Sequence, residues 1–240
     1  MRSIDRGAPD IAALRVEHDA YVATLRALGV AVDELPALEA YPDSLFVEDP
    51  ALVFPEAAIL LRPGAPSRLG ETGELRPTLE ARFPRVVELE GQGFADGGDV
   101  LLTPDAVYVG LSARTDVEGA AALAGALTSL GRRAVVVTPP PGVLHLKTAC
   151  SLVDDRTLLA TRAMADAGLF PGLDTIVVPD GEEPVANALC VNGVVLIAAG
   201  FPQTTALLAG RGYDVRTLKL DEVMKLDAGL SCMSLRWSDV

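Results

Sequence analysis

Two histidines and three cysteines are the residues of this chain best suited to acid–base and nucleophilic chemistry. His18 lies in a charged stretch, where we expect a solvated surface position. His145 follows the proline-rich turn 139–142, and Cys232 follows a turn at 227–231, so each stands where a new extended segment is expected to begin. A cysteine with a histidine remote in sequence is the minimal arrangement for thiol catalysis. Cys232 and His145 are therefore candidates, although a histidine held only by structural hydrogen bonds remains the alternative for His145.

Acidic side chains recur just ahead of two predicted strands. Asp43, Glu48 and Asp49 lie close together in sequence, and Asp96 and Asp99 flank a glycine pair. A glycine pair permits close approach of the backbone, and carboxylates that converge on one point can hold a planar cation through charge-assisted hydrogen bonds. The pattern predicts a site for a guanidinium or amidinium group, against the simpler interpretation that both segments are solvated acidic turns.

The elements that must position these side chains follow a repeated order of two strands, a helix and a third strand. In the clearest copy, two strands flank the turn 103–105, a helix runs from Thr115 to Gly131, and a strand follows at 134–137. Thr115 and Glu118 fit a capping box, and Gly131 suits the left-handed position that ends a helix. The predicted strands are 51–54, 58–61, 86–89, 99–102, 106–109, 134–137, 151–153, 157–160, 175–178, 188–191, 194–198 and 214–218, with further helices at 77–83 and 202–209.

The two ends of the chain supply only parts of a further unit. A helix at 11–28 and a strand at 30–35 are expected at the start, and an extended segment at 230–237 is expected at the end. Residues 1–240 then form a single α/β domain, a five-bladed propeller of repeated ββαβ units whose first blade is closed by the C-terminus. Closure of this kind protects strand edges. An ordinary open α/β sheet, and a domain linker at 139–142, are the alternatives.

The composition limits the partners and the compartment. The 240 residues include 33 Asp and Glu against 20 Lys and Arg, a net charge of −13. Such a charge repels phosphate backbones and anionic lipid, so nucleic acid and membranes are not expected partners, whereas a cationic small molecule is attracted. Cys150 and Cys190 lie in apolar segments typical of core thiols, no CxxC pair suggests a metal site, and no apolar run approaches the length of a membrane helix. We expect a cytoplasmic protein without a metal.

Six short motifs together resemble one enzyme family. They are DSLFVED at 43–49, RPGAPSR at 62–68, DGGDV at 96–100, GLSART at 110–115, HLKT at 145–148 and GLSCMS at 229–234. Over nearly its whole length the chain is similar to the dimethylarginine dimethylaminohydrolases, guanidino-modifying enzymes with the five-bladed, pentein-type α/β propeller fold. The resemblance implies hydrolysis of Nω-methylated arginine, either asymmetric dimethylarginine or monomethylarginine, to citrulline and dimethylamine or methylamine.

The resemblance also implies roles for individual residues. Cys232 is the expected nucleophile, His145 the acid and base, and Asp96 the carboxylate that orients and polarises the histidine. The implied substrate contacts are Asp43, Glu48 and Asp49 at the guanidinium, Arg68 and Arg114 at the α-carboxylate, and the backbone carbonyl of Leu226 at the α-amino group. Thiolate attack would give a covalent S-alkylthiouronium intermediate that water hydrolyses, so no cofactor is expected. The expected partner is this small-molecule substrate, and a homodimer is compatible with the chain.

Three other functions stay open at this point. Arginine deiminases share the catalytic residues, but in that group the second residue after the histidine is typically acidic, whereas this chain has Lys147. An amidinotransferase would pass the amidino group to an amine, and a non-catalytic propeller that acts as a binding protein would have no use for the catalytic set. Family members also usually begin with one more strand and a loop that serves as a lid, so we expect the first blade to lack its N-terminal strand.

Overall fold

The computed structural model describes residues 7–238. The chain divides into two compact units, one of Met1–Pro36 with Thr148–Ser231 and one of Ala37–Lys147 with Cys232–Val240. Within the described residues each unit contains two sheets of three strands, and the strands of every sheet lie side by side in chain order. The predicted α/β class with repeated ββαβ units is confirmed, and the alternative of one open sheet is wrong.

The first sheet of the Ala37–Lys147 unit joins an antiparallel hairpin to a parallel third strand. β1 (Ala51–Phe54) pairs with β2 (Ala57–Leu60), and β2 pairs in parallel with β3 (Val86–Glu88). The connection from β2 to β3 contains the short 3₁₀ helix η1 (Pro66–Arg68) and the helix α2 (Glu71–Arg82). A parallel pair requires such a crossover, and a helix supplies it.

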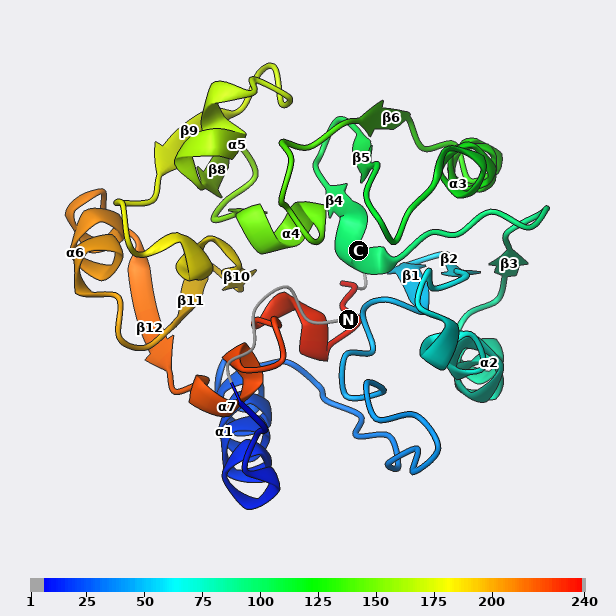
Figure 1. Ribbon diagram of the computed structural model, residues 1–240, viewed down its shortest axis with the longest axis horizontal. Coiled ribbons are helices and arrows are strands. Elements are labelled where there is room, and N and C mark those ends of the chain that lie inside the picture. The colour runs from blue at the N-terminus through cyan, green and yellow to red at the C-terminus, as the bar shows by residue number, and fades with distance from the viewer. Residues whose placement is uncertain (1–6, 239–240) are drawn as a thin grey trace. The chain divides into compact units, whose positions relative to one another are not determined.

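The second sheet of this unit repeats the order. β4 (Val100–Leu102) pairs antiparallel with β5 (Val107–Gly110), and β5 pairs in parallel with β6 (Ala134–Val137) after the helix α3 (Val117–Ser129). The 3₁₀ turn η2 (Gly97–Asp99) leads directly into β4. In Figure 1, α2 lies beside the first sheet and α3 beside the second.

Successive side chains along the strands of the first sheet belong alternately to two apolar clusters, one on each face. Leu52, Phe54 and Ile59 pack with buried residues of β4, β5 and α3, including Val109 and Leu123. The intervening residues pack against α2; this cluster consists of Ala51, Val53, Ala58, Leu60, Leu75, Leu79 and Phe83. The period of two follows from the pleat of a strand, and both faces are apolar because both are covered. The site described below is therefore attached to a sheet that is buried on two sides.

The other unit carries the same repeat twice. Its sheets consist of β7 (Cys150–Leu152), β8 (Thr157–Ala160) and β9 (Asp174–Val177), and of β10 (Leu189–Val191), β11 (Val194–Ala198) and β12 (Asp214–Leu218). Asn192 and Gly193 close the β10–β11 hairpin with φ values of 49° and 81°, as a two-residue turn between twisted strands requires. The remaining helices of the chain are α1 (Ile11–Ala27), α4 (Leu146–Ala149), α5 (Arg162–Asp166), η3 (Glu183–Ala186), α6 (Pro202–Gly210), α7 (Asp221–Met224) and η4 (Ser231–Met233). Between residues 7 and 238, no helix has the length and apolar character needed to cross a bilayer.

Two predicted strands at the ends of the chain are wrong. Residues 30–35 form no strand; α1 ends where the N–H of Val30 donates to the carbonyl of Leu25, and the segment pairs with no strand in the described part of the chain. Residues 230–237 form the turn η4 and then run without ladder pairing. The reason in both cases is the lack of a strand partner, without which an extended segment gains no ladder hydrogen bonds. Any element ahead of residue 7 lies outside the described residues.

Two predicted helix starts also differ from the structure. α3 is capped by Asp116, whose carboxylate accepts the N–H of Gly119, and not by Thr115. The side chains of Thr115 and Glu118 form hydrogen bonds with other partners. Gly131 adopts the expected positive φ of 71°. α2 begins at Glu71 and runs through the residue at which the predicted helix starts, Pro77.

Candidate active site

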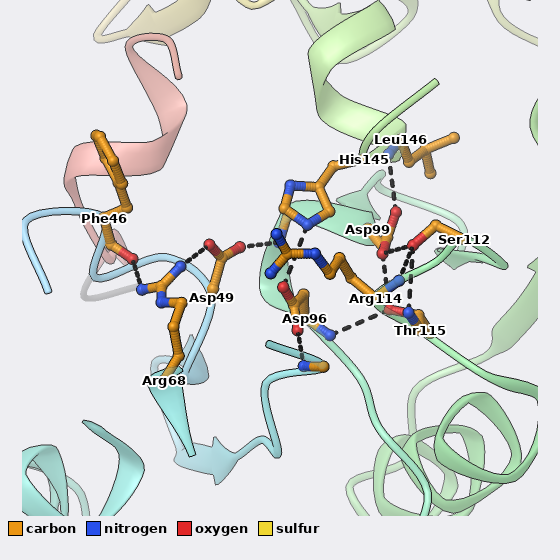
Figure 2. A network of polar contacts seen from close by, with 12 residues as sticks. Phe46, Asp49, Arg68, Asp96, Asp99, Ser112, Arg114, Thr115, His145 and Leu146 are labelled. Carbon is orange, nitrogen blue, oxygen red and sulfur yellow. Dashed lines mark hydrogen bonds and ion pairs between the residues drawn. The ribbon is translucent and has the colours of Figure 1, made fainter. Parts of the chain in front are cut away.

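His145 and Asp96 form a buried pair in the Ala37–Lys147 unit. Nε2 of His145 lies 3.2 Å from Oδ2 of Asp96, whose side chain is fully buried. The other oxygen of Asp96 accepts the N–H of Gly64 at 2.6 Å, which fixes the orientation of the carboxylate. The structure thus brings together the predicted acid–base residue and its predicted orienting carboxylate (Figure 2).

Asp49 is the third member of this buried group. One side-chain polar atom from each of Asp49, Asp96 and His145 lies within 4.8 Å of the other two. Asp49 accepts the N–H of Gly98 at 2.9 Å and is ion-paired with Arg68. Carboxylates and imidazoles are also metal-binding groups, but here they already serve one another and the backbone. We assign no metal to them, and a metal-free site stays a prediction.

The surrounding carboxylates control the charge of His145. Burial by itself favours the neutral ring, but the charge of Asp49, the hydrogen bond to Asp96 and the charge of Asp99 raise the pKa of His145 to about 9. Burial likewise opposes ionisation of Asp49, yet the charges of His145 and Arg68 hold the pKa of that carboxyl below its usual value. At neutral pH the imidazole is therefore protonated and able to donate a proton.

The glycine pair lets the backbone pass close to these side chains. A Cβ on Gly98 would lie 2.7 Å from Nδ1 of His145, and a Cβ on Gly97 would lie 2.0 Å from the carbonyl oxygen of Glu48. Both distances are far below van der Waals contact, and the second neighbour is backbone, which cannot swing away. The close approach predicted for Gly97 and Gly98 is confirmed.

Cys232 belongs to the same compact unit as His145 and Asp96. It lies in the turn η4 with a half-buried side chain, and its carbonyl accepts the N–H of Glu48 at 3.1 Å. Cys150 is buried in β7, which confirms the core position predicted for it, whereas Cys190 in β10 is only half-buried, so its predicted core position is not borne out. Of the three cysteines, Cys232 is the one attached by a backbone hydrogen bond to the acidic segment next to His145.

Arg68 is buried among acceptors. Its guanidinium donates to Glu71 from Nε at 3.0 Å and from Nη2 at 2.6 Å, to Asp49 from Nη1, and to the carbonyl of Phe46 from Nη2 at 2.8 Å. Burial works against the charge, but Glu71 and Asp49 raise the pKa of Arg68 above its already high value. Every guanidinium nitrogen is engaged, so the predicted contact of Arg68 with a substrate carboxylate stays a prediction. The sequence reasoning missed Glu71, although an acidic residue three positions after an arginine is a common pairing signal.

Arg114 and Asp43 offer charges that are not used within the fold. The guanidinium of Arg114 is half-buried and has no hydrogen-bond or ion-pair partner among residues 7–238, and the same holds for the carboxylate of Asp43. The backbone of Arg114 is nevertheless fixed, because its N–H donates to Oγ of Ser112 at 2.9 Å. In Figure 2 the Arg114 side chain points back toward the group formed by Asp49, Asp96 and His145. An amino acid carries the opposite charges that such a pair can bind.

Glu48 already faces two cations. Nζ of Lys147 lies 2.5 Å from its Oε1 and Nη2 of Arg236 lies 3.9 Å from the same oxygen, and Glu48 is 3% exposed. The role of Glu48 at a guanidinium therefore stays a prediction. Leu226, the predicted backbone ligand, follows α7 in the other unit, where its N–H donates to the carbonyl of Val223; its substrate contact also stays a prediction.

Comparison with known proteins finds relatives that match nearly the whole chain. The model of the arginine deiminase family matches residues 76–176. An N(G),N(G)-dimethylarginine dimethylaminohydrolase of Pseudomonas aeruginosa is 39% identical over 232 residues, covering 96% of this chain and 91% of that protein. The protein of the same name from Streptomyces coelicolor is 37% identical over 91% of this chain and 83% of its own length. A solved structure of the Pseudomonas protein, a cysteine-to-serine mutant complexed with citrulline, has a TM-score of 0.92 at 37% identity and covers 98% of this chain and 95% of that one. This likeness confirms the predicted α/β fold class with its repeated strand–helix units.

Proposed function

Because the chain belongs to the dimethylarginine dimethylaminohydrolase family, we propose that it hydrolyses Nω-methylated arginine to citrulline and dimethylamine or methylamine. The observation that carries the proposal is the buried pair of His145 and Asp96 in the unit that also contains Cys232. The relative that was solved with bound citrulline supports citrulline as the product. The acidic surroundings of His145 suit a cationic guanidinium substrate.

In the first half of the reaction the thiolate of Cys232 forms a C–S bond to the guanidinium carbon. A free cysteine has a pKa of about 8.5, so the positive charges of the substrate and of protonated His145 are needed to favour the thiolate. His145 then donates its proton to the dimethylamino nitrogen as the C–N bond breaks, which its raised pKa permits at neutral pH. Dimethylamine leaves, and a thiouronium group remains on Cys232.

In the second half the neutral His145 acts as a base. It takes one proton from a water molecule while the oxygen attacks the thiouronium carbon. The tetrahedral adduct collapses to citrulline, the C–S bond breaks, and Cys232 is returned as the thiolate. The remaining proton of the adduct goes to the dimethylamine released earlier, so the net reaction consumes one water molecule. Two displacements of this kind are easier than one direct attack of water on a delocalised cation.

The proposed substrate contacts are the charged groups around His145, together with the arginines and the backbone carbonyl that the family resemblance implies. Asp49 and Asp96 are the buried carboxylates beside His145 and would accept hydrogen bonds from the guanidinium N–H groups. Arg114 has no partner among residues 7–238 and would bind the α-carboxylate, with Arg68 as the second arginine predicted for this end. Asp43, Glu48 and the carbonyl of Leu226 complete the proposed set.

The ion pair of Glu48 with Lys147 favours a methylated substrate over plain arginine. Each methyl group on the guanidinium removes one N–H donor, so a methylated substrate needs fewer carboxylates around it. Lys147 stands where arginine deiminases typically have an acidic residue, so this chain offers one carboxylate fewer to the N–H groups of an unmethylated guanidinium. Arginine deiminase activity, and amidino transfer to an amine, are the alternatives that the assay must separate.

The test is citrulline formation from asymmetric dimethylarginine, monomethylarginine and arginine in parallel, with wild type, Cys232→Ser and Cys190→Ser. We expect citrulline from the methylated substrates, loss of activity in Cys232→Ser, and wild-type rates in Cys190→Ser, which makes the same change in a β10 cysteine. Activity on arginine alone would identify a deiminase, and ornithine formation in the presence of an amine acceptor would identify an amidinotransferase. Full activity in Cys232→Ser would remove the nucleophile from the mechanism.

The cytoplasmic location and the homodimer compatible with the sequence belong to the same proposal. Three cysteines that form no disulfide in the described structure support a reducing compartment. Analytical ultracentrifugation of the purified chain would determine its oligomeric state, and fractionation of the source cells its location.

A further inference from the structure

The carboxylate of Asp99 joins two loops that the proposed reaction needs. Asp99 is fully buried at the end of the turn η2. Its Oδ1 accepts the N–H of Leu146, the residue after His145, at 2.9 Å. One oxygen of the buried Asp99 carboxylate is thus hydrogen-bonded to the backbone beside His145, the proposed proton donor. Figure 2 shows Asp99 between the His145–Leu146 segment and the loop of Ser112 and Thr115.

The other oxygen of Asp99 holds the loop that carries Arg114. Oδ2 accepts the hydroxyl of Ser112 at 2.6 Å and the hydroxyl of Thr115 at 2.7 Å. Oγ of Ser112 in turn accepts the N–H of Arg114 at 2.9 Å, and Oγ1 of Thr115 accepts the N–H of Asp96 at 3.1 Å. The two hydroxyls therefore transmit the position of the Asp99 carboxylate to a substrate-binding arginine and to the orienting carboxylate.

We propose that Asp99 is a positioning residue, which sets the distance between the proton donor His145 and the carboxylate-binding Arg114 without touching the substrate. The inference rests on the proposed function, because these are the two ends of the substrate in that reaction. A small displacement has a large effect on the rate: a shift of about 1 Å at a reacting group can cost on the order of a hundredfold.

The buried location argues that Asp99 does more than fill a gap in the fold. Burial opposes its ionisation and raises its pKa, while His145, the two hydroxyls and the N–H of Leu146 favour the charged form. An apolar residue in this place would avoid that cost, but it would leave the two hydroxyls and the N–H without an acceptor. Asp99 also acts with Asp49 and Asp96 to keep His145 protonated.

The experiment compares two ways of breaking the connection. Asp99→Asn keeps the size of the side chain and one oxygen that can accept the N–H of Leu146. Its NH₂ group then faces the hydroxyls of Ser112 and Thr115 and cannot accept their hydrogen bonds. Ser112→Ala combined with Thr115→Val leaves Asp99 in place and removes both hydroxyl donors. For each variant we expect kcat for asymmetric dimethylarginine to fall roughly tenfold or more and KM to rise. Thr115→Ser keeps the hydroxyl and should retain wild-type values.

The matched control is Asp154→Asn in the other unit. Asp154 also accepts a hydroxyl, from Tyr213, and two backbone N–H groups, those of Arg156 and Thr157. It belongs to neither the catalytic nor the binding set, so its replacement should lower the melting temperature without changing kcat or KM.

The titration of His145, followed by NMR, adds a readout that does not depend on turnover. We expect a lower pKa of His145 in Asp99→Asn and an unchanged one in Asp154→Asn. If Asp99→Asn lowers only the melting temperature, and kcat, KM and the His145 titration match those of wild type, the positioning role is wrong and Asp99 is merely structural. If Asp99→Asn does not fold, the Ser112→Ala/Thr115→Val variant decides by kcat and KM alone, because it keeps the Asp99 charge beside His145: wild-type kcat and KM in that variant would overturn the positioning role. If wild type itself makes no citrulline, the proposed function fails, and an unchanged His145 titration in Asp99→Asn would then overturn the inference separately.

Discussion

Replacing Asp96 by asparagine tests the electrostatic basis of the site most directly. The amide oxygen of Asp96→Asn can still accept the N–H of Gly64, so the loop geometry is retained. The amide nitrogen then faces Nε2 of His145 as a donor, which favours a neutral ring with a lone pair on that nitrogen. We expect the pKa of His145 to fall, and the alkaline limb of the kcat/KM profile to move to lower pH with it.

The size of the shift follows from the distance between the two groups. Oδ2 of Asp96 lies 3.2 Å from Nε2 of His145. At an effective dielectric constant of about 20, Coulomb's law gives about 5 kcal/mol at this separation, which corresponds to nearly four pK units. This is an upper limit, because the charges of Asp49 and Asp99 remain and the site can rehydrate; opposite charges at this range shift a pKa by about 1–3 units. From the starting value of about 9, the pKa of His145 in the variant should lie between roughly 6 and 8.

The assay is an NMR titration of the imidazole nitrogens, which is simple because the chain has two histidines. His18→Gln assigns the two signals, and Asp105→Asn, at an exposed aspartate in the β4–β5 turn, serves as the control variant. A wild-type pKa of His145 near its ordinary value of 6.5 would refute the reasoning, because the three carboxylates would then fail to outweigh burial. So would a drop of less than about half a unit in Asp96→Asn.

Three further outcomes test the buried network. Gly98→Ala should lower activity at least roughly tenfold, because its Cβ would meet Nδ1 of His145 at 2.7 Å, whereas Gly125→Ala in open space on α3 should raise the melting temperature; similar effects would contradict the close approach. Arg68→Met should lower the free energy of unfolding in urea by about 3–5 kcal/mol, since it removes the guanidinium partner of two buried carboxylates, and Arg76→Met in an exposed pair by about 1 kcal/mol or less. Because its pKa is raised, His145 should stabilise the fold fully below pH 6.5 and lose this contribution as the pH rises through about 9, so wild type should lose melting temperature across that range more steeply than His145→Gln.

The repeat of the fold was readable because its strands are short runs of apolar residues between turn residues. β6 and β12 begin and end at the predicted residues, and the β10–β11 hairpin lies where the sequence placed it. Helix α2 was harder to predict from the sequence, because Gly73 and Pro77 have low helix propensity. Burial of Leu75 and Leu79 against the first sheet overrides that preference, and periodicity in a short segment with few apolar residues does not reveal it.

In the candidate site, too, some residues could be recognised from the sequence and others could not. The residue types of Cys232, His145 and Asp96 are rare enough, or placed regularly enough, to be recognised in the sequence. The partners of Arg68 were not, because its neutralisation by Asp49 depends on how a loop folds back over a distance of 19 residues. A charged residue in a motif gives its type, and only the fold shows whether that charge is still available to a substrate.

The capping error at α3 follows from the same competition for hydrogen-bond partners. A threonine followed three residues later by a glutamate satisfies the capping rule, but Thr115 is engaged by the buried Asp99. A buried carboxylate without donors is more costly than a helix terminus that a neighbouring side chain can cap, so the hydroxyl goes to the carboxylate. Asp116 then caps the helix one residue later. Local rules fail at this position because its side chain belongs to the site, and such a failure next to catalytic candidates is itself a signal of function.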